Sequence, residues 1–192
     1  RGISKKLTLA TEHAPILLQL TLLDLIQEIG DLEQRLKRVD HALAAYADTN
    51  ANVQALLGIQ GVGITIATAF VARVPSIHLF ERGRSFASWL GLTCREYSSG
   101  QTRRLSRITK QGDRYLRMML IHGARAALMA ARRKVANGKQ LTCLETWSVN
   151  TQARVGHNKA TVALANKMAR IMWAVWTRHE DFNGDYALRF AA

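Results

Sequence analysis

Apolar residues follow a regular heptad pattern near the start of the chain. From Leu18 to Leu43 they are separated alternately by four and three positions, and charged side chains occupy many of the positions between them. The apolar positions are Leu18, Leu22, Leu25, Ile29, Leu32, Leu36, Val39 and Leu43. This spacing predicts a long helix with one apolar seam, which is typical of a coiled coil used for self-association. A long helix packed on its own domain is the alternative.

The next apolar segment, residues 56–74, contains Gly61-Val62-Gly63 and continues in a helical pattern rich in Thr and Ala. Two glycines let the backbone turn sharply and approach a phosphate, and the following helix directs its N-terminal amides at that phosphate. The segment therefore resembles a helix-hairpin-helix in which Gly61 and Gly63 contact nucleic acid. Two helices joined by a plain glycine turn are the alternative.

Helical spacing also dominates the rest of the chain. Residues 113–134 and 158–177 each carry an apolar, small-residue stripe that predicts a helix, and residues 93–106 are predicted to be a loop. Aromatic residues at roughly helical spacing, expected in the core, are Phe80, Phe86 and Trp89. Strand-like alternation is almost absent, so the predicted fold class is all-α.

These patterns divide the chain into three parts. Residues 1–52 are predicted to hold the coiled-coil helix and a linker, residues 53–182 a helical domain with the helix-hairpin-helix-like motif, and residues 183–192 a tail. A length of 192 residues with 48% apolar content is enough to bury a core. The uncharged residues 49–72 are interrupted by polar side chains and glycines, which favours a buried segment over a membrane span.

Charge and cysteine content narrow the function. The formal net charge is +13. Between Arg95 and Lys139 twelve Lys and Arg residues face two acids, Glu96 and Asp113. Such a concentration predicts a polyanionic partner, most often nucleic acid. The two cysteines lack metal-ligand spacing and suggest a reducing cytoplasm.

A serine-glycine turn opens this basic region. Tyr97, Ser98, Ser99 and Gly100 run directly into a series of cations. These cations are Arg103, Arg104, Arg107, Lys110, Arg114 and Arg117. A hydroxyl beside fixed cations suits a phosphodiester, which the cations hold and the hydroxyl attacks. The alternative is a basic binding surface whose serines only shape a turn.

The order of these motifs resembles the C-terminal transposase domain of the insertion sequence 110 family, especially its 1111 branch. The segments that carry the resemblance are LLGIQGVGITIATAFVARV, FERGRSFASWLGLTCREYSSGQTRRLSRITKQGDRYLRMMLIHGARAAL and VALANKMARIMWAVWTR. Together they cover about residues 53–182, and the heptad helix is similar to the coiled coil that precedes the domain in that family.

The resemblance implies an RNA-guided DNA recombinase built from two halves, which acts in the bacterial cytoplasm. One half is RuvC-like and holds Mg²⁺ on four acidic residues, whereas the other supplies a serine that forms a covalent phosphoserine link to DNA. The halves meet across subunits of a tetramer, so DNA, a structured guide RNA and further copies of the chain are the expected partners.

The resemblance also assigns roles to residues. The nucleophile is the serine before the glycine of a tyrosine-x-serine-glycine turn, which is Ser99, with Ser98 as the second choice. Nucleic-acid contacts are expected at Gly61, Gly63, Tyr97, Gly100, Arg103, Arg104, Arg107, Lys110, Arg114 and Arg117. The RuvC-like half and its acidic set have no counterpart in this sequence, so no metal is expected in this chain and the isolated chain is expected to be inactive. A non-catalytic DNA- or RNA-binding remnant or regulator is the alternative function.

Overall fold

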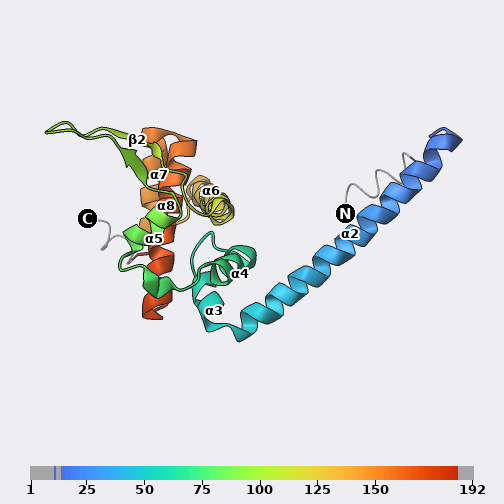
Figure 1. Cartoon of the computed structure of the whole chain (residues 1–192). Helices are drawn as coiled ribbons and strands as arrows, with labels where there is room; N and C mark the ends of the chain where they lie inside the picture. Colours follow the sequence, from blue (N-terminus) through green and yellow to red (C-terminus); the bar gives the residue numbers. More distant parts are fainter. Residues whose placement is uncertain (1–10, 12–13, 186–192) are drawn as a thin grey trace. The chain divides into compact units, whose positions relative to one another are not determined.

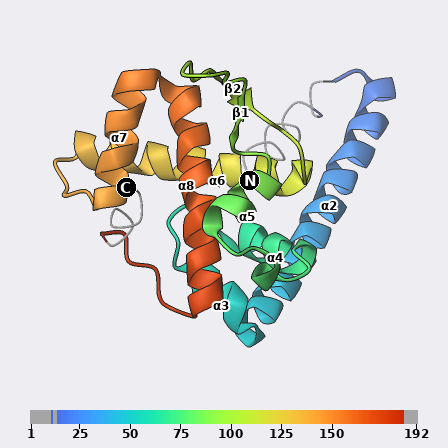
Figure 2. The same cartoon turned by 60° about the vertical axis from the view of Figure 1, so that its left-hand side comes forward.

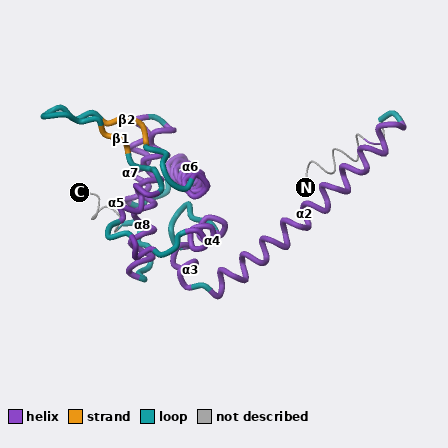
Figure 3. The backbone as a smooth tube through the Cα atoms, in the orientation of Figure 1, coloured by secondary structure: helices purple, strands orange, loops and turns teal. Residues whose placement is uncertain are grey.

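The computed structural model describes Thr11 and residues 14–185, which are mostly helical (Figures 1 and 3). The chain divides into two units, one ending at Tyr46 and the other beginning at Ala47, and each is described by itself. The predicted all-α class is confirmed.

The first unit consists of most of helix α2, Ile16–Thr49, which begins directly after Pro15. The predicted long helix is therefore confirmed, and its heptad seam is largely solvent-exposed. Leu18, Leu36 and Val39, for example, are 54%, 63% and 56% exposed. An exposed apolar seam on a helix of this length is what a coiled-coil partner would cover. Self-association itself stays a prediction.

The second unit opens with two short helices, α3 (Ala51–Leu57) and α4 (Ile64–Arg73), which pack on each other. Asn50 caps α3 by accepting hydrogen bonds from the amides of Asn52 and Val53, at 3.1 and 3.2 Å. This cap explains why α2 and α3 are separate helices, since the side-chain oxygen takes the place of a preceding turn of helix.

Helix α8, His157–Arg178, is the centre of the second unit, and α3, α5, α6 and α7 all pack against it (Figure 2). Helix α5 spans Gly83–Trp89, α6 spans Arg114–Ala136 and α7 spans Cys143–Val155. A single 3₁₀ turn, η1 at Ile77–Leu79, precedes α5. The predicted helices at 113–134 and 158–177 thus correspond to α6 and α8.

The predicted aromatic core is confirmed at the start of this unit. Phe86 is fully buried, and Phe80 meets it edge-on with ring centroids 5.1 Å apart. Trp89 stacks on Phe86 with the centroids 6.0 Å apart. These contacts join α5 to the end of η1, and α5 also packs on α8.

The prediction of a loop at residues 93–106 was wrong, because the chain forms an antiparallel hairpin there. Strand β1, Cys94–Glu96, pairs with β2, Leu105–Ile108, through the partners Cys94 with Ile108 and Glu96 with Leu105. Strand β2 has one more residue than β1 between these pairs, which makes a β-bulge. Almost every residue of the hairpin is exposed, so no buried face imposed an alternating pattern on the sequence.

Helix α7 and the segment after α8 complete the unit. Thr142 and Glu145 form a reciprocal capping box at the start of α7. The amide of Leu144 donates to the carbonyl of Gly184 at 3.3 Å, and that of Cys143 donates to Asp185 Oδ1 at 3.0 Å. The beginning of the predicted tail therefore packs on α7, and the rest of it lies outside the described residues.

Candidate nucleic-acid interface

The β-hairpin projects from the helices and carries the predicted serine turn at its end (Figures 1 and 3). The Tyr97 amide donates to the Arg104 carbonyl at 2.9 Å. Ser99 and Thr102 exchange two backbone hydrogen bonds of 3.2 and 3.1 Å. Gly100 has a φ of 57°, the positive value that a two-residue hairpin turn needs at its first central position. The tyrosine-x-serine-glycine sequence therefore forms the tip of an antiparallel hairpin that is closed by a two-residue turn.

Ser98 uses its hydroxyl to hold the hairpin together. Its Oγ donates to Glu96 Oε1 at 2.7 Å and accepts from the backbone amide of Arg104 at 3.2 Å. Arg103 Nε lies 3.4 Å from the same Glu96 oxygen. The hydroxyl of Ser98 thus joins the two strands, as the turn-shaping alternative predicted.

Ser99 differs from its neighbour. Because side chains alternate along a strand, Ser99 and Tyr97 point to the face opposite Glu96 and Ser98. Both are exposed, Tyr97 at 62%. In the part of the chain that the structure describes, the Ser99 hydroxyl has no hydrogen-bond partner. Of the two serines, Ser99 has the hydroxyl that is available to a ligand.

Five of the predicted cations follow the tip along the second half of the hairpin and into the start of α6. Arg103, Arg104, Arg107, Lys110 and Arg114 are all exposed. Arg95, also exposed, donates from Nη2 to the carbonyl of Thr109 at 3.2 Å. Among the described residues of the hairpin, the pair of Arg103 with Glu96 is the only ion pair. The surface is therefore strongly positive and open to a polyanion.

Arg117 lies apart from this surface. It is only 8% exposed, and its Nη1 donates to the carbonyls of Leu90 and Gln111, at 3.0 and 3.5 Å. Leu90 precedes the hairpin and Gln111 follows it, so the guanidinium joins the two ends of the hairpin base. In this position Arg117 orients the hairpin and has little surface for a phosphate.

Two glycines allow the two ends of the hairpin to pack closely at its base. Gly91 and Gly112 have positive φ values of 69° and 97°. A Cβ on Gly91 would overlap the backbone of Gln111, and one on Gly112 would overlap the carbonyl of Trp89. On the other side, Asn166 of α8 donates from Nδ2 to the Leu92 carbonyl at 3.0 Å. The exposed tip thus stands on a tightly packed base.

Asp113 connects the base to α6 and α4. Its Oδ1 caps α6 by accepting from the Leu116 amide at 2.9 Å, and its Oδ2 lies 2.8 Å from the Arg73 guanidinium. Burial raises the pKa of Asp113, but the hydrogen bonds from Leu116 and Arg73 outweigh it and bring the pKa below its usual value. Asp113 is therefore a structural anion beside the basic hairpin.

The two motif glycines lie on the α3–α4 turn. Gly61 has a φ of 87° and crosses the backbone of Gly123 in α6, where a Cβ would come within 2.6 Å of the Gly123 carbonyl oxygen. Packing against α6 therefore accounts for the glycine at position 61. Gly63 is exposed at the start of α4, with open space where a Cβ would be. The structure shows two helices joined by a glycine turn, as both the helix-hairpin-helix interpretation and its alternative predicted, and phosphate contact stays a prediction.

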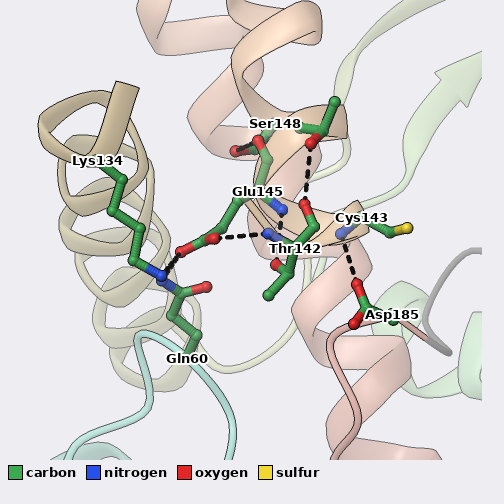
Figure 4. Close-up of polar contacts among 8 residues, drawn as sticks. Gln60, Lys134, Thr142, Cys143, Glu145, Ser148 and Asp185 are labelled. Carbon is green, nitrogen blue, oxygen red and sulfur yellow. Dashed lines mark hydrogen bonds and ion pairs between the residues drawn. The ribbon is translucent and has the colours of Figure 1, made fainter. Parts of the chain in front are cut away.

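A buried carboxylate, Glu145, has a structural explanation as well (Figure 4). It accepts from Gln60 at 2.6 Å and Lys134 at 2.7 Å through Oε1, and from the Thr142 amide at 2.9 Å through Oε2. Burial raises the pKa of Glu145, but these hydrogen bonds more than compensate and lower it. With its oxygens occupied, Glu145 joins the α3–α4 turn, α6 and α7.

The sequence did not predict the contacts of two residues of this region, Glu96 and Asn166. Glu96 could have been found from its i, i+2 spacing to Ser98 once residues 94–108 are read as a hairpin. Asn166 leaves no such signal, because its partner is a backbone carbonyl 74 positions away. Within residues 14–185 no three His, Cys, Asp or Glu side chains lie close enough to hold a metal ion, so these residues do not fit a Mg²⁺ site.

Comparison with known proteins decides the family. Residues 53–140 match the family described as Transposase IS116/IS110/IS902. A probable family 20 transposase of Pseudomonas aeruginosa is 38% identical over 172 residues, which are 88% of this chain and 49% of that protein. The chain belongs to this transposase family.

Two other relatives of this family member are insertion-sequence transposases. The transposase for insertion sequence element IS1111A of Coxiella burnetii is 40% identical over 161 residues, covering 84% of the chain and 41% of the relative. That for IS1328 of Yersinia enterocolitica is 32% identical over 188 residues, covering 95% and 54%. This transposase-family chain thus spans about half the length of the curated relatives it matches. None of its described helices is long and apolar enough to cross a membrane.

Proposed function

We propose that this chain carries the DNA-attacking part of an insertion-sequence transposase, with Ser99 as the nucleophile. The observation that carries the proposal is the exposed, unpartnered hydroxyl of Ser99 at the tip of a cation-lined hairpin. Membership in the transposase family supports DNA as the substrate.

The reaction is a transesterification. Ser99 Oγ attacks the phosphorus of a DNA phosphodiester, a serine–phosphate bond forms, and the bond from phosphorus to one deoxyribose oxygen breaks. The serine proton passes to a base, and the released sugar oxygen takes up a proton. The carboxylate of Glu96 is bound by Ser98 and Arg103, so we assign the base to groups other than these hairpin residues.

The cations have two roles in this proposal. Arg103, Arg104, Arg107, Lys110 and Arg114 hold backbone phosphates and stabilise the negative charge that grows in the transition state. Tyr97 contacts a sugar or base beside Ser99. Gly63 allows the first amides of α4 to approach a second phosphate. Arg117 is a positioning residue that acts through the hairpin base.

The chain works with partners in this proposal. The α2 seam joins copies of the chain, a structured RNA guides the choice of DNA, and a RuvC-like acidic domain completes the reaction centre. The exposed seam supports the first of these, and the sequence resemblance supports the other two.

A trap for covalent protein–DNA adducts tests the nucleophile. The chain is combined with a RuvC-like domain, guide RNA, Mg²⁺ and labelled DNA, then denatured and separated by size. We expect adducts with the unchanged chain and with Ser98→Ala, and none with Ser99→Ala. Adducts that persist in Ser99→Ala would exclude Ser99 as the nucleophile.

A binding module without catalysis is the second candidate. The engagement of the Ser98 hydroxyl within the hairpin favours it, because that serine has a purely structural role. Both candidates predict DNA or RNA binding that weakens as salt rises, with a slope that reflects the number of phosphates contacted. Salt-dependent binding without any adduct, even from the unchanged chain, would favour the binding module.

A further inference from the structure

A pocket of about 370 Å³ lies between α5, the second half of α8 and the segment after α8. It is separate from the hairpin tip, because it lies at the start of α5 and the hairpin follows the end of α5. Its volume is in the range of pockets that hold small organic ligands. Neither the heptad seam nor the serine turn accounts for it.

Positive charge dominates the lining. Five cationic side chains and two acidic ones, Glu180 and Asp181, contribute to it. The cations are Arg82, Arg84, Lys167, Arg170 and Arg178. Among the described residues, Arg82, Arg84 and Lys167 form no ion pair. The pocket thus offers an anion several cations that have no carboxylate partner.

Lys167 is the unusual member of this group. It is only 7% exposed, and its Nζ lies 4.3 Å from the centre of the Trp147 ring. Burial and the nearby charge of Arg170 lower the pKa of Lys167, and burial and Arg84 lower that of Arg170. Each of these cations therefore makes the charged form of its neighbour less favourable, and a bound anion would reduce this repulsion.

The other wall is apolar and aromatic. Ile171, Trp173 and Phe182 line it. The Trp173 indole N–H donates to the Phe80 carbonyl at 2.8 Å, which fixes the orientation of the ring. Gly83 brings α5 close to α8, since a Cβ there would lie 3.1 Å from the Arg170 carbonyl oxygen. This approach holds Arg82 and Arg84 beside the aromatic wall.

We propose that this pocket binds one unpaired nucleotide of a single-stranded nucleic acid. Arg82 and Arg84 hold its phosphate, Lys167 adds a buried positive charge, and the base lies against Trp173 and Phe182. Stacking on aromatic rings together with cationic phosphate contacts is how proteins bind single strands. A base inside a duplex cannot stack on the rings of this pocket without leaving its own stack. The carboxylates of Glu180 and Asp181 are available to accept hydrogen bonds from exocyclic amino groups of the base.

This proposal rests on the proposed function in one respect, because it takes nucleic acid as the partner. The test therefore uses fluorescence anisotropy with a labelled single-stranded RNA and a labelled DNA duplex, each titrated over a range of salt concentrations. The pocket variant is Arg82→Gln with Arg84→Gln, both at exposed positions. The matched control is Arg132→Gln with Arg133→Gln, which removes the same charge from exposed positions near the end of α6.

We expect the pocket variant to bind the single strand more weakly than the control does, and both variants to bind the duplex alike. Loss of the one phosphate contact that Arg82 and Arg84 share lowers the slope of log K against log salt for single strands by about 0.7. A 4-thiouridine in the strand should crosslink to residues 171–183. AMP should displace the strand, whereas inorganic phosphate at the same concentration should not.

Other outcomes separate the two proposals. Equal single-strand binding by the pocket and control variants, with weaker binding by Arg103→Gln and Arg107→Gln, would overturn the pocket and leave the proposed function intact. Displacement by inorganic phosphate as efficient as by AMP would overturn the nucleotide assignment, because only the phosphate would then be recognised. If the unchanged chain bound neither nucleic acid, both proposals would fail.

Discussion

Arg117 Nη1 donates a hydrogen bond to the carbonyl oxygen of Leu90 at 3.0 Å, and this bond joins α6 to the residue before the hairpin. The arginine therefore acts inside the protein although it belongs to the most basic stretch of the sequence. Its neighbours Arg114 and Lys110 remain exposed.

Replacing Arg117 with Met should destabilise the chain. The variant keeps an apolar stem of similar length but leaves the buried Leu90 carbonyl and the more exposed Gln111 carbonyl without their donor, at a cost of about 1–3 kcal/mol. Urea unfolding measures the difference, with Arg114→Met, at the exposed first residue of α6, as the control. If Arg117→Met unfolds like the control while DNA binding falls, Arg117 contacts DNA directly.

Gly112→Ala should be much more harmful than Gly138→Ala. Both glycines have positive φ, at 97° and 63°, so each substitution carries backbone strain of about 1–2 kcal/mol. Only at Gly112 would the new Cβ also overlap a neighbour, the Trp89 carbonyl, whereas Gly138 has open space. Thermal unfolding followed by circular dichroism should show a larger fall in Tm for Gly112→Ala. Equal falls would mean that the hairpin base adjusts.

Glu145 should make stability depend on pH. Its pKa is lowered in the folded chain from an ordinary value of 4.5, so it stabilises the fold above that pH. The contribution is lost as pH falls through the lower, folded-state pKa. Glu145→Gln should reduce the free energy of unfolding at pH 7 by about 1–3 kcal/mol and flatten its decline in acid. Denaturant unfolding from pH 7 to pH 3 checks this, with the exposed Glu81→Gln as the control. An unchanged acid decline in Glu145→Gln would contradict the assignment.

The α2 seam should control the oligomeric state. Ile29→Asp with Leu36→Asp places two carboxylates in the seam, where a partner helix would bury them, and should convert the assembly to a monomer in light scattering. Gln34→Asp with His41→Asp adds the same carboxylates at exposed positions outside the seam and should leave the mass unchanged. A mass that is the same in all three proteins would show that the seam has no role in assembly.

Periodicity predicted the long helices correctly because their pattern repeats over many turns. The predicted helix at 158–177 agrees with α8 at both ends to within a residue, and α2 contains the whole heptad run. Helix α7 was not predicted from the sequence. Its buried residues are Leu144, Glu145, Ser148 and Thr151, and three of these are polar. A helix held by a capping box and a buried carboxylate has no apolar stripe to recognise.

The sequence predicted which residues belong to the candidate site but not how their side chains are arranged. Ser99, Gly100 and the exposed arginines could be proposed from the order of residues alone. The different roles of Ser98 and Ser99 follow from the alternation of side chains along a strand. The sequence did not show this strand, because the hairpin has no buried face. The burial of Arg117 depends on carbonyls at both ends of that hairpin, and sequence spacing does not encode contacts of this kind.

The exposed hairpin has a consequence for hydrogen exchange. Its tip is held by backbone bonds and by side chains that are open to water, whereas its base is buried around Leu90 and Leu92. Segments with few buried contacts open at a small free-energy cost, and buried ones open only with the whole fold. Amides from Tyr97 to Arg104 should therefore exchange early and those of α8 last. A partner that docks on the tip would slow exchange there first, which makes the hairpin amides a direct reporter of binding.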